Sequence, residues 1–368
     1  MKSRTSFYKS QNAPIDIWLI LATFILIIFG LIAIYDSSVV TAFRDLFYYF
    51  KNQLAWATLG FMALSFFSFF DYHKLIKLGP VLLAVGSILL IAVLIPFIGT
   101  EVLGARRWIS IQDLTFQPSE FVKLAVIFYT THIMSKFKDY KIGLFDSVLV
   151  YFLPVLLVTA LVVVQPDLGT ALIFTALAMI IYFASGAPLW HFLLALPTLA
   201  SAALVAVLLQ PYRLNRLKAF LDPAFDPAGA SYQINQIVIA IAAGGLFGVG
   251  LGSARSKFEF IPEVHNDAIF AVIAEEVGFI GALLLIFIIL FLISRAIKIA
   301  KETSDYSGKI LAVGLASLLA VQSLFNIASN VALVPLTGVP LPFISYGGSS
   351  LFVTLASIGI LINIKRRS

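Results

Sequence analysis

Long apolar runs, separated by short clusters of charged or turn-forming residues, dominate the sequence. Most of them approach the roughly 20 residues that an α-helix needs to cross about 30 Å of hydrocarbon. Open backbone is not stable in lipid, so each run is expected to be helical. The predicted spans cover residues 16–36, 53–70, 78–98, 118–135, 145–164, 167–185, 189–209, 267–294, 309–330 and 350–364. The pattern predicts an all-α polytopic membrane protein with about ten transmembrane helices in a single transmembrane domain, residues 1–368.

Composition narrows the possible classes of function. Of the 368 residues, 60% are hydrophobic and only 12% are charged, whereas soluble domains have about 25% charged residues. So few charges cannot cover a soluble globule of this size, which excludes a soluble enzyme, a disordered chain and a coiled coil. The chain has no cysteine and only four scattered histidines. Disulfides, thiolate catalysis and cysteine-bound metals are therefore excluded, and no metal site of the protein itself is expected.

Lysine and arginine positions indicate which ends of the helices face the cytoplasm. Fifteen of the 25 lie in one alternating set of tails and loops, and ten lie elsewhere, five of them in a single long loop. The positive-inside rule then places both termini in the cytoplasm, as an N-terminal tail 1–15 and a C-terminal end 365–368. The net charge of +6 is explained by these loops, and no nucleic-acid partner is expected.

Three segments fall on the predicted outer side. They are residues 99–119, the long loop 210–266 between the seventh and eighth helices, and residues 331–349. The last of these carries no charge and is rich in glycine and proline, so it can re-enter the membrane if other parts of the protein cover its backbone. The outer side is therefore where we expect the functional residues.

Three groups that contain acidic residues are candidates for chemistry. Asp267 begins the eighth span close to Glu263 and His265, where it either caps the helix or takes a proton from a hydroxyl group. Glu120 and Lys123 are three residues apart and share a helix face, which fits a simple ion pair or the floor of a cavity.

The third group is the adjacent pair Glu275 and Glu276, which lies about 12 Å deeper along the eighth helix than Asp267. It indicates either a polar cavity or a buried structural pair.

Cations on the outer side oppose the general charge trend. Arg106, Arg107, Arg213 and Arg216 are either interfacial anchors or ligands for an anionic substrate, because guanidinium groups bind phosphate in bidentate fashion. The glycine run 244–252 does not fit a nucleotide-binding loop, since no strand precedes it. Flexible packing near the membrane surface explains this run better.

Taken together, several motifs resemble the SEDS family (shape, elongation, division and sporulation). They follow the family's order over nearly the whole chain. They are Gly-Ala-Arg-Arg-Trp-Ile at 104–109, Gln-Pro-Ser-Glu-Phe-Val-Lys at 117–123, Gln-Pro-Asp-Leu-Gly-Thr at 165–170, Arg-Leu-Asn-Arg at 213–216, Leu-Asp-Pro at 221–223, Asp-Pro at 226–227, Pro-Glu-Val-His-Asn-Asp at 262–267, Glu-Glu-Val-Gly at 275–278 and Pro-Leu-Pro-Phe-Ile-Ser-Tyr-Gly-Gly-Ser-Ser at 340–350. Residues 248–252 with Lys257 favour the division branch (FtsW) over the elongation branch (RodA), although residues 336–342 lean slightly toward RodA. Asn266 and Ala268 replace the threonine and phenylalanine that commonly flank the key aspartate in the family.

The resemblance implies a peptidoglycan glycosyltransferase that polymerises lipid II at the outer face of the bacterial cytoplasmic membrane. The implied partners are lipid II, the undecaprenyl-diphosphate-linked glycan and a class B penicillin-binding protein, which is a transpeptidase. Asp267 would be the general base of an inverting sugar transfer. The substrate-binding residues would be Arg106, Arg107, Arg213, Arg216, Glu120, Lys123, His265 and Ser345. No cofactor is expected, although a divalent cation can accompany the diphosphate. A lipid II flippase or other transporter, and a division scaffold without chemistry, remain as alternatives.

Overall fold

The computed structural model describes residues 15–38, 47–102, 104–111, 114–138, 140, 142–227, 229, 231–257 and 266–368. Its main body is a bundle of ten helical segments, one for each predicted span. They are α1 (Ile17–Ser38), α2 (Tyr48–Phe69), α3 (Tyr72–Leu94), α4 (Pro118–Lys136), the continuous segment α5 (Leu144–Asp146), η1 (Ser147–Phe152) and α6 (Leu153–Val164), α7 (Leu168–Ala184), α8 (Trp190–Leu208), α11 (Ile269–Glu302), α12 (Tyr306–Asn330) and α13 (Gly348–Arg367). Seven of the described helical segments are long and apolar enough to cross a membrane, and α7 is a shorter apolar helix. The predicted helical, polytopic fold class is confirmed.

Two of the predicted outer segments contain structure of their own. Residues 99–119 hold a three-stranded antiparallel sheet in the order β1 (Thr100–Val102), β2 (Ala105–Ile111) and β3 (Leu114–Phe116). We expected only a loop there, because strands of three to seven residues leave little periodic signal in a sequence. The long loop 210–266 contains two further helices, α9 (Pro211–Leu221) and α10 (Tyr232–Gly244).

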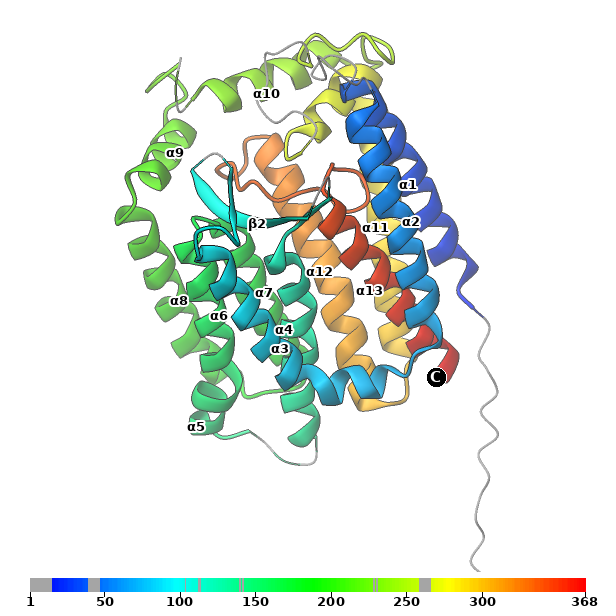
Figure 1. Cartoon of the computed structure of the whole chain (residues 1–368), viewed down its shortest axis with the longest axis vertical. Coiled ribbons are helices and arrows are strands. Elements are labelled where there is room, and N and C mark those ends of the chain that lie inside the picture. The colour runs from blue at the N-terminus through cyan, green and yellow to red at the C-terminus, as the bar shows by residue number, and fades with distance from the viewer. Residues whose placement is uncertain are drawn as a thin grey trace, which may run out of the picture.

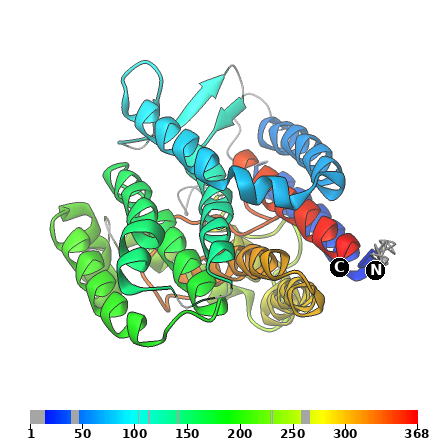
Figure 2. The same cartoon turned by 90° about the horizontal axis from the view of Figure 1, so that it is seen from below.

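These segments gather at one end of the bundle, which we call the loop end. Figure 1 shows β2, α9, α10 and the segment between α12 and α13 at that end. The start of α1 and the end of α13 lie close together at the opposite end, as Figures 1 and 2 show. The arrangement agrees with an even number of crossings between the two termini.

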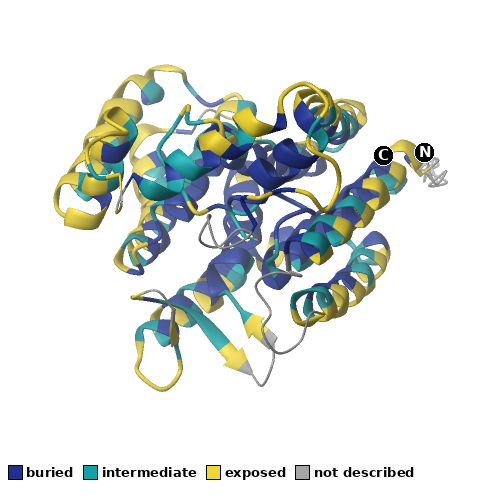
Figure 3. Ribbon diagram, turned by 90° about the horizontal axis from the view of Figure 1, so that it is seen from above, coloured by how far each residue is buried: buried dark blue, intermediate teal, exposed yellow. Residues whose placement is uncertain are grey.

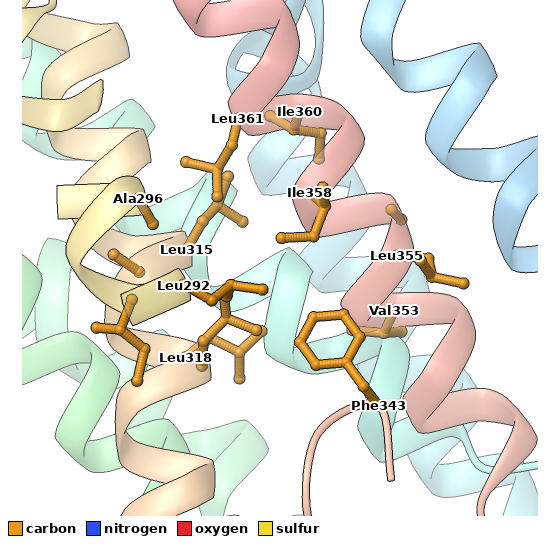
Figure 4. Close-up of a cluster of buried hydrophobic side chains, with 14 of the residues drawn as sticks. Leu292, Ala296, Leu315, Leu318, Phe343, Val353, Leu355, Ile358, Ile360 and Leu361 are labelled. Carbon is orange, nitrogen blue, oxygen red and sulfur yellow. The ribbon is translucent and has the colours of Figure 1, made fainter. Parts of the chain in front are cut away.

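Burial is uneven among the helices (Figure 3). In α13, 89% of the most apolar window is buried, and in α12 61% is buried, whereas in α8 only 6% is buried. The core lies between α11, α12 and α13, where Leu292, Leu315 and Ile358 pack around Phe343 (Figure 4). Phe343 belongs to the segment between α12 and α13, so this segment is part of the core.

Helix α11 is interrupted near its start. It has 34 residues, and Gly278 adopts φ 70° and ψ −174°, which breaks the helical path. The glycine run after α10 crosses α11 at this break, and its backbone supplies the missing hydrogen bonds. The amides of Val249 and Gly250 donate to the carbonyls of Glu275 and Glu276, each over 3.0 Å, and the amides of Phe279 and Ile280 donate to the carbonyls of Gly245 and Leu246.

The same crossing explains the glycines of the run. A Cβ added to Gly248 would lie 2.0 Å from the carbonyl oxygen of Glu276, so only glycine allows this approach. The run packs near the end of the bundle as expected, but it is held by backbone hydrogen bonds rather than being flexible.

Candidate active site

The polar side chains of the loop end converge on residues 336–340, which we call the 336–340 segment. Its backbone carbonyls accept hydrogen bonds from side chains of two other elements. Arg216 on α9 donates to Leu336 O over 3.0 Å, Asn326 on α12 donates to Val339 O over 2.8 Å, and Gln322 on α12 donates to Pro340 O over 3.1 Å. Protein side chains thus satisfy backbone groups that a segment beside the core cannot leave unpaired.

Asp267 lies against the middle of this segment. The position that a Cβ would take on Gly338 is 3.9 Å from Asp267 Oδ2, the one atom within 4 Å of it among the described residues other than Thr337 and Val339. Gly338 is exposed and Asp267 is half-buried, with its Oδ1 atom buried and its Oδ2 atom on the side of Gly338. Helix α11 begins after Asp267, with Ala268 at the N-cap and no side-chain cap hydrogen bond. The structure thus places Ala268, and not Asp267, at the N-cap position that the sequence allowed for Asp267.

Asp267 and Arg216 meet the same short stretch of chain. Arg216 binds Leu336 O and Asp267 lies beside Gly338, and two residues of extended chain span at most about 7 Å. The structure therefore brings a carboxylate and a guanidinium to the two ends of one tripeptide.

Glu120 and Lys123 reach the same segment from the inside. Both are almost fully buried, and Lys123 Nζ lies 2.6 Å from Glu120 Oε1 and 3.1 Å from Gln322 Oε1. Gln322 in turn binds Pro340 O and Ser350 Oγ. The second carboxylate oxygen of Glu120 is buried without a hydrogen-bond partner within the described part of the chain. The predicted ion pair is present, and it belongs to a network that supports the 336–340 segment from below.

Arg107 binds the turn between α6 and α7, and Arg213 binds the last turns of α6 and α8. Arg107 on β2 donates from Nε to Gln165 O over 2.8 Å and from Nη2 to Pro166 O. Arg213 on α9 donates to Ala206 O over 2.8 Å and to Val163 O over 2.7 Å. Carbonyls at the end of a helix carry a partial negative charge, so both cations stabilise the end of α6.

The charges of these two arginines are close enough to influence each other. Burial lowers the pKa of Arg213, the charge of Arg107 lowers it further, and Asp167 opposes both effects. Both guanidinium groups bind carbonyl oxygens and so keep their full positive charge at the loop end.

Arg106 differs from the other arginines. Its Nε lies 3.1 Å from Glu101 Oε2 across the β1–β2 pair, and both side chains are largely exposed. An acid therefore neutralises part of its charge. Of the four predicted phosphate ligands in the structure, Arg106 has the least free charge to offer.

Ser345, a predicted substrate-binding residue, is buried. Its hydroxyl accepts a hydrogen bond from Leu341 N over 2.7 Å, and its carbonyl accepts one from Gln53 Nε2 over 3.2 Å. These contacts close the turn 341–345 and join it to α2. His265 and Glu263 lie outside the described residues.

Glu275 and Glu276 bind residues 252–256 of the long loop. Glu275 accepts hydrogen bonds from the amides of Arg255 and Ser256, and Glu276 accepts one from Gly252 N over 3.2 Å. The sequence left open whether these glutamates line a polar cavity or form a buried structural pair. Their hydrogen bonds to the long loop give them a structural role.

Lys257 attaches the same part of the long loop to two helices through ion pairs. Its Nζ lies 2.8 Å from Asp36 Oδ2 at the end of α1 and 3.1 Å from Glu276 Oε1 on α11. The ammonium group is almost fully buried and joins the two helices to residue 257 of the long loop.

Comparison with known proteins identifies the family. The family model described as "Cell cycle protein" (FtsW, RodA, SpoVE) matches residues 17–368. The chain belongs to the FtsW/RodA/SpoVE family. This is the SEDS family that the sequence motifs indicated, so that prediction is confirmed.

Individual relatives cover almost all of this family member. Stage V sporulation protein E of Bacillus subtilis (strain 168) is 38% identical over 357 residues, which are 96% of this chain and 97% of that protein. "Probable peptidoglycan glycosyltransferase FtsW" of Trichlorobacter lovleyi is 40% identical over 356 residues, which are 96% of this chain and 93% of that protein.

Two solved structures share the fold. A chain from "Structural coordination of polymerization and crosslinking by a peptidoglycan synthase complex" matches with a TM-score of 0.80 and 29% identity, over 96% of this chain and 98% of that one. The crystal structure of the rod shape determining protein RodA of Thermus thermophilus matches with a TM-score of 0.70 and 26% identity, over 96% and 97%.

In this member of the FtsW/RodA/SpoVE family, the sequence interpretation overlooked the side chains that hold the candidate site. Gln322, Asn326 and Asn330 lie four residues apart, so they form a polar stripe on one face of the apolar helix α12. Buried polar residues at helical spacing in a membrane span mark functional positions, and this signal was readable in the sequence. Lys257 and Asp36 had no such signal, because only folding brings them together.

Proposed function

We propose that this protein is a peptidoglycan glycosyltransferase that polymerises lipid II into glycan strands during cell division. Relatives named FtsW peptidoglycan glycosyltransferases support the reaction and the division branch. The observation that carries the proposal is the convergence of Asp267, Arg216 and the network of Glu120 and Lys123 on the 336–340 segment. A carboxylate beside cations at one end of a membrane-spanning bundle suits a lipid-linked diphosphate substrate.

In the proposed reaction, the 4-hydroxyl of the incoming sugar attacks the anomeric carbon of the lipid-linked strand. A new glycosidic bond forms, the bond to the diphosphate breaks, and undecaprenyl diphosphate leaves with the electron pair. Asp267 takes the proton of the attacking hydroxyl as general base, a step typically worth about 10²–10⁴ in rate. The half-buried position of Asp267 beside the exposed Gly338 allows a sugar to reach it.

The arginines are assigned to the diphosphate. Fixed cations near a leaving group stabilise the charge that develops on it. Arg107, Arg213 and Arg216 suit this role because carbonyl oxygens orient them without neutralising them. Among the described residues, no three histidine, aspartate or glutamate side chains gather as a metal site. If the reaction uses a divalent cation, we propose that it accompanies the diphosphate of the substrate.

The loop end is proposed to face outward from the bacterial cytoplasmic membrane, with both termini in the cytoplasm. The lysine and arginine distribution along the sequence supports this orientation. We also propose a class B penicillin-binding protein as the partner, so that crosslinking follows polymerisation. The similarity to a chain of a peptidoglycan synthase complex supports a partner of this kind.

The decisive experiment compares Asp267→Asn with the wild-type protein, using purified lipid II and gel analysis of the glycan strands. Asparagine keeps the size of the side chain but cannot accept the proton. We expect normal folding and lipid II binding, with polymerisation reduced about 10²-fold or more. Asp146→Asn, at the opposite end of the bundle, serves as the matched control and should polymerise normally.

Two results would overturn this proposal. A fully active Asp267→Asn preparation, shown free of other polymerases, would remove Asp267 from the mechanism. Wild-type protein that moves lipid II across sealed vesicles without making glycan strands would instead indicate a flippase.

A further inference from the structure

The polar stripe of Gln322, Asn326 and Asn330 on α12 ends beside Asp267, the proposed general base. Asn326 and Asn330 lie in the last turn and a half of α12, and both have 0% exposed surface. Buried amide groups in an apolar helix cost free energy unless their hydrogen bonds are made. Their partners therefore show what these two side chains are for.

Both asparagines bind the backbone of Asp267. The carbonyl oxygen of Asp267 accepts a hydrogen bond from Asn326 Nδ2 over 2.9 Å and another from Asn330 Nδ2 over 2.8 Å. A carbonyl oxygen has two lone pairs, so these two contacts use its full capacity. The peptide plane after Asp267 is thus fixed from one side by two rigidly placed amides.

Asn326 also fixes the surface opposite the carboxylate. The other hydrogen of its Nδ2 is donated to Val339 O over 2.8 Å, and Val339 follows Gly338, which lies beside Asp267 Oδ2. One side-chain amide therefore ties together Asp267 and the 336–340 segment.

Asn330 supports this arrangement from the next turn of the helix. Its Nδ2 donates over 2.9 Å to Asn326 O as well as to Asp267 O.

We propose that Asn326 and Asn330 are positioning residues for the glycosyl transfer. They hold the backbone of Asp267 so that its carboxylate keeps a constant distance from the 336–340 segment, where the acceptor sugar binds. This proposal rests on the proposed function, in which Asp267 is the general base. A catalytic group needs placement to within about 0.5 Å, and a displacement of about 1 Å can cost about 10²-fold in rate.

The test uses Asn326→Leu, which keeps the approximate size of the side chain and removes both donated hydrogen bonds. The matched control is Ser323→Ala on the same helix. Ser323 is buried, and its hydroxyl makes no hydrogen bond within the described residues. Both variants are measured for lipid II polymerisation, lipid II binding and hydrogen exchange of the peptide covering residues 266–271.

For Asn326→Leu we expect kcat to fall about 10- to 100-fold with KM nearly unchanged. We also expect faster exchange at the start of α11. Ser323→Ala should match the wild type in both measurements. Asn326→Gln keeps the amide and should recover part of kcat, which a merely space-filling role would not explain.

Two outcomes separate the parts of this reasoning. Unchanged exchange at residues 266–271, or a loss confined to KM, would overturn the positioning role. If wild-type protein makes no glycan strands, the proposed function fails, yet the exchange measurement still decides whether Asn326 holds the backbone of Asp267. Asn330→Leu, which removes one of the two contacts to Asp267 O, should show a smaller effect in the same direction.

Discussion

Arg213 shows how one charged side chain can serve both the fold and the candidate site. It is buried on α9, yet it donates hydrogen bonds to two backbone carbonyls, those of Ala206 and Val163. Burial and the nearby charge of Arg107 lower its pKa, but an arginine starts from so high a value that it stays charged at neutral pH. The sequence presented Arg213 as an anchor or a phosphate ligand. The structure adds a third role, which is to join α9 to the end of α6.

We predict that Arg213→Ala destabilises the protein far more than Arg106→Ala. Loss of Arg213 leaves two carbonyls without their charged donors, and hydrogen bonds to charged groups contribute about 1.5–3 kcal/mol. Arg106 forms an exposed pair with Glu101, and exposed pairs contribute about 0.2–1 kcal/mol. Thermal unfolding in detergent compares the two variants directly. Equal melting temperatures would show that Arg213 has no structural role.

A second prediction at this scale concerns Lys257. Replacing it with methionine leaves the carboxylates of Asp36 and Glu276 without their shared cation. Breaking a buried ion pair by removing one partner typically costs about 3–5 kcal/mol, so Lys257→Met should strongly lower the melting temperature. The double variant Lys257→Met with Glu276→Gln should recover part of the loss, because one of the uncompensated charges is then gone. A double variant no more stable than the single one would contradict this explanation.

At the scale of elements, the sequence predicted what depends on long apolar runs and missed what depends on short or distant contacts. The ten spans agree with the helical segments of the bundle because lipid-facing helices are apolar over about 20 residues. The sheet at 100–116 was missed because its strands are too short for a clear period of two. Asp267 was found from its motif, while Asn326 and Asn330 were read only as part of a span. Their role requires the contact between α12 and the start of α11, which lies about 60 residues earlier in the chain.

The interruption of α11 gives a prediction about glycines. Gly248 has φ 81°, and a Cβ there would lie 2.0 Å from Glu276 O. Gly245 belongs to the same run and has φ 53°, but its Cβ position meets no atom within 4 Å from the described part of the chain beyond its own sequence neighbours. Both alanine variants carry backbone strain of about 1–2 kcal/mol. Only Gly248→Ala must also push the glycine run away from α11.

Gly248→Ala should therefore unfold at a clearly lower temperature than Gly245→Ala. It should also lose protection from hydrogen exchange at the amides of residues 279 and 280. Similar melting temperatures for the two variants would mean that the crossing is loose enough to accept a methyl group.

On the scale of the whole molecule, the two ends of the bundle differ in chemistry. Ion pairs join elements at the end that holds the C-terminus, for example Arg295 with Asp16 and Lys365 with Glu302, each at 2.7 Å. At the loop end, Arg107, Arg213 and Asn326 bind backbone carbonyls, in addition to the ion pairs of Arg106 with Glu101 and of Lys257 with Asp36 and Glu276. Both ends thus contain ion pairs, and the loop end also has side chains that hold its backbone carbonyls in place.

The distribution of lysine and arginine along the sequence predicts the orientation of the two ends in the membrane. Reporter fusions after Asp222 in the long loop and after Ser368 should give opposite signals. The first should report the outer side and the second the cytoplasm, because lysine and arginine favour the cytoplasmic side. A fusion after Asp146, at the end opposite the loop end, should match the one after Ser368. The same signal from Asp222 and Ser368 would contradict the topology.

The contacts of the 336–340 segment also bear on the order in which the protein is made. Arg216 is synthesised 120 residues before the carbonyl that it binds at Leu336, and Asp267 is synthesised 59 residues before Asn326. A nascent chain that has inserted everything up to α11 therefore carries Asp267 and Arg216, but not the residues of α12 and of the 336–340 segment that bind them. The working arrangement can form only after translation has passed residue 340 and the last helices have entered the bilayer. Truncated or stalled chains are thus left without an assembled site, and synthesis of the final tenth of the sequence marks the earliest moment at which the protein can begin to act.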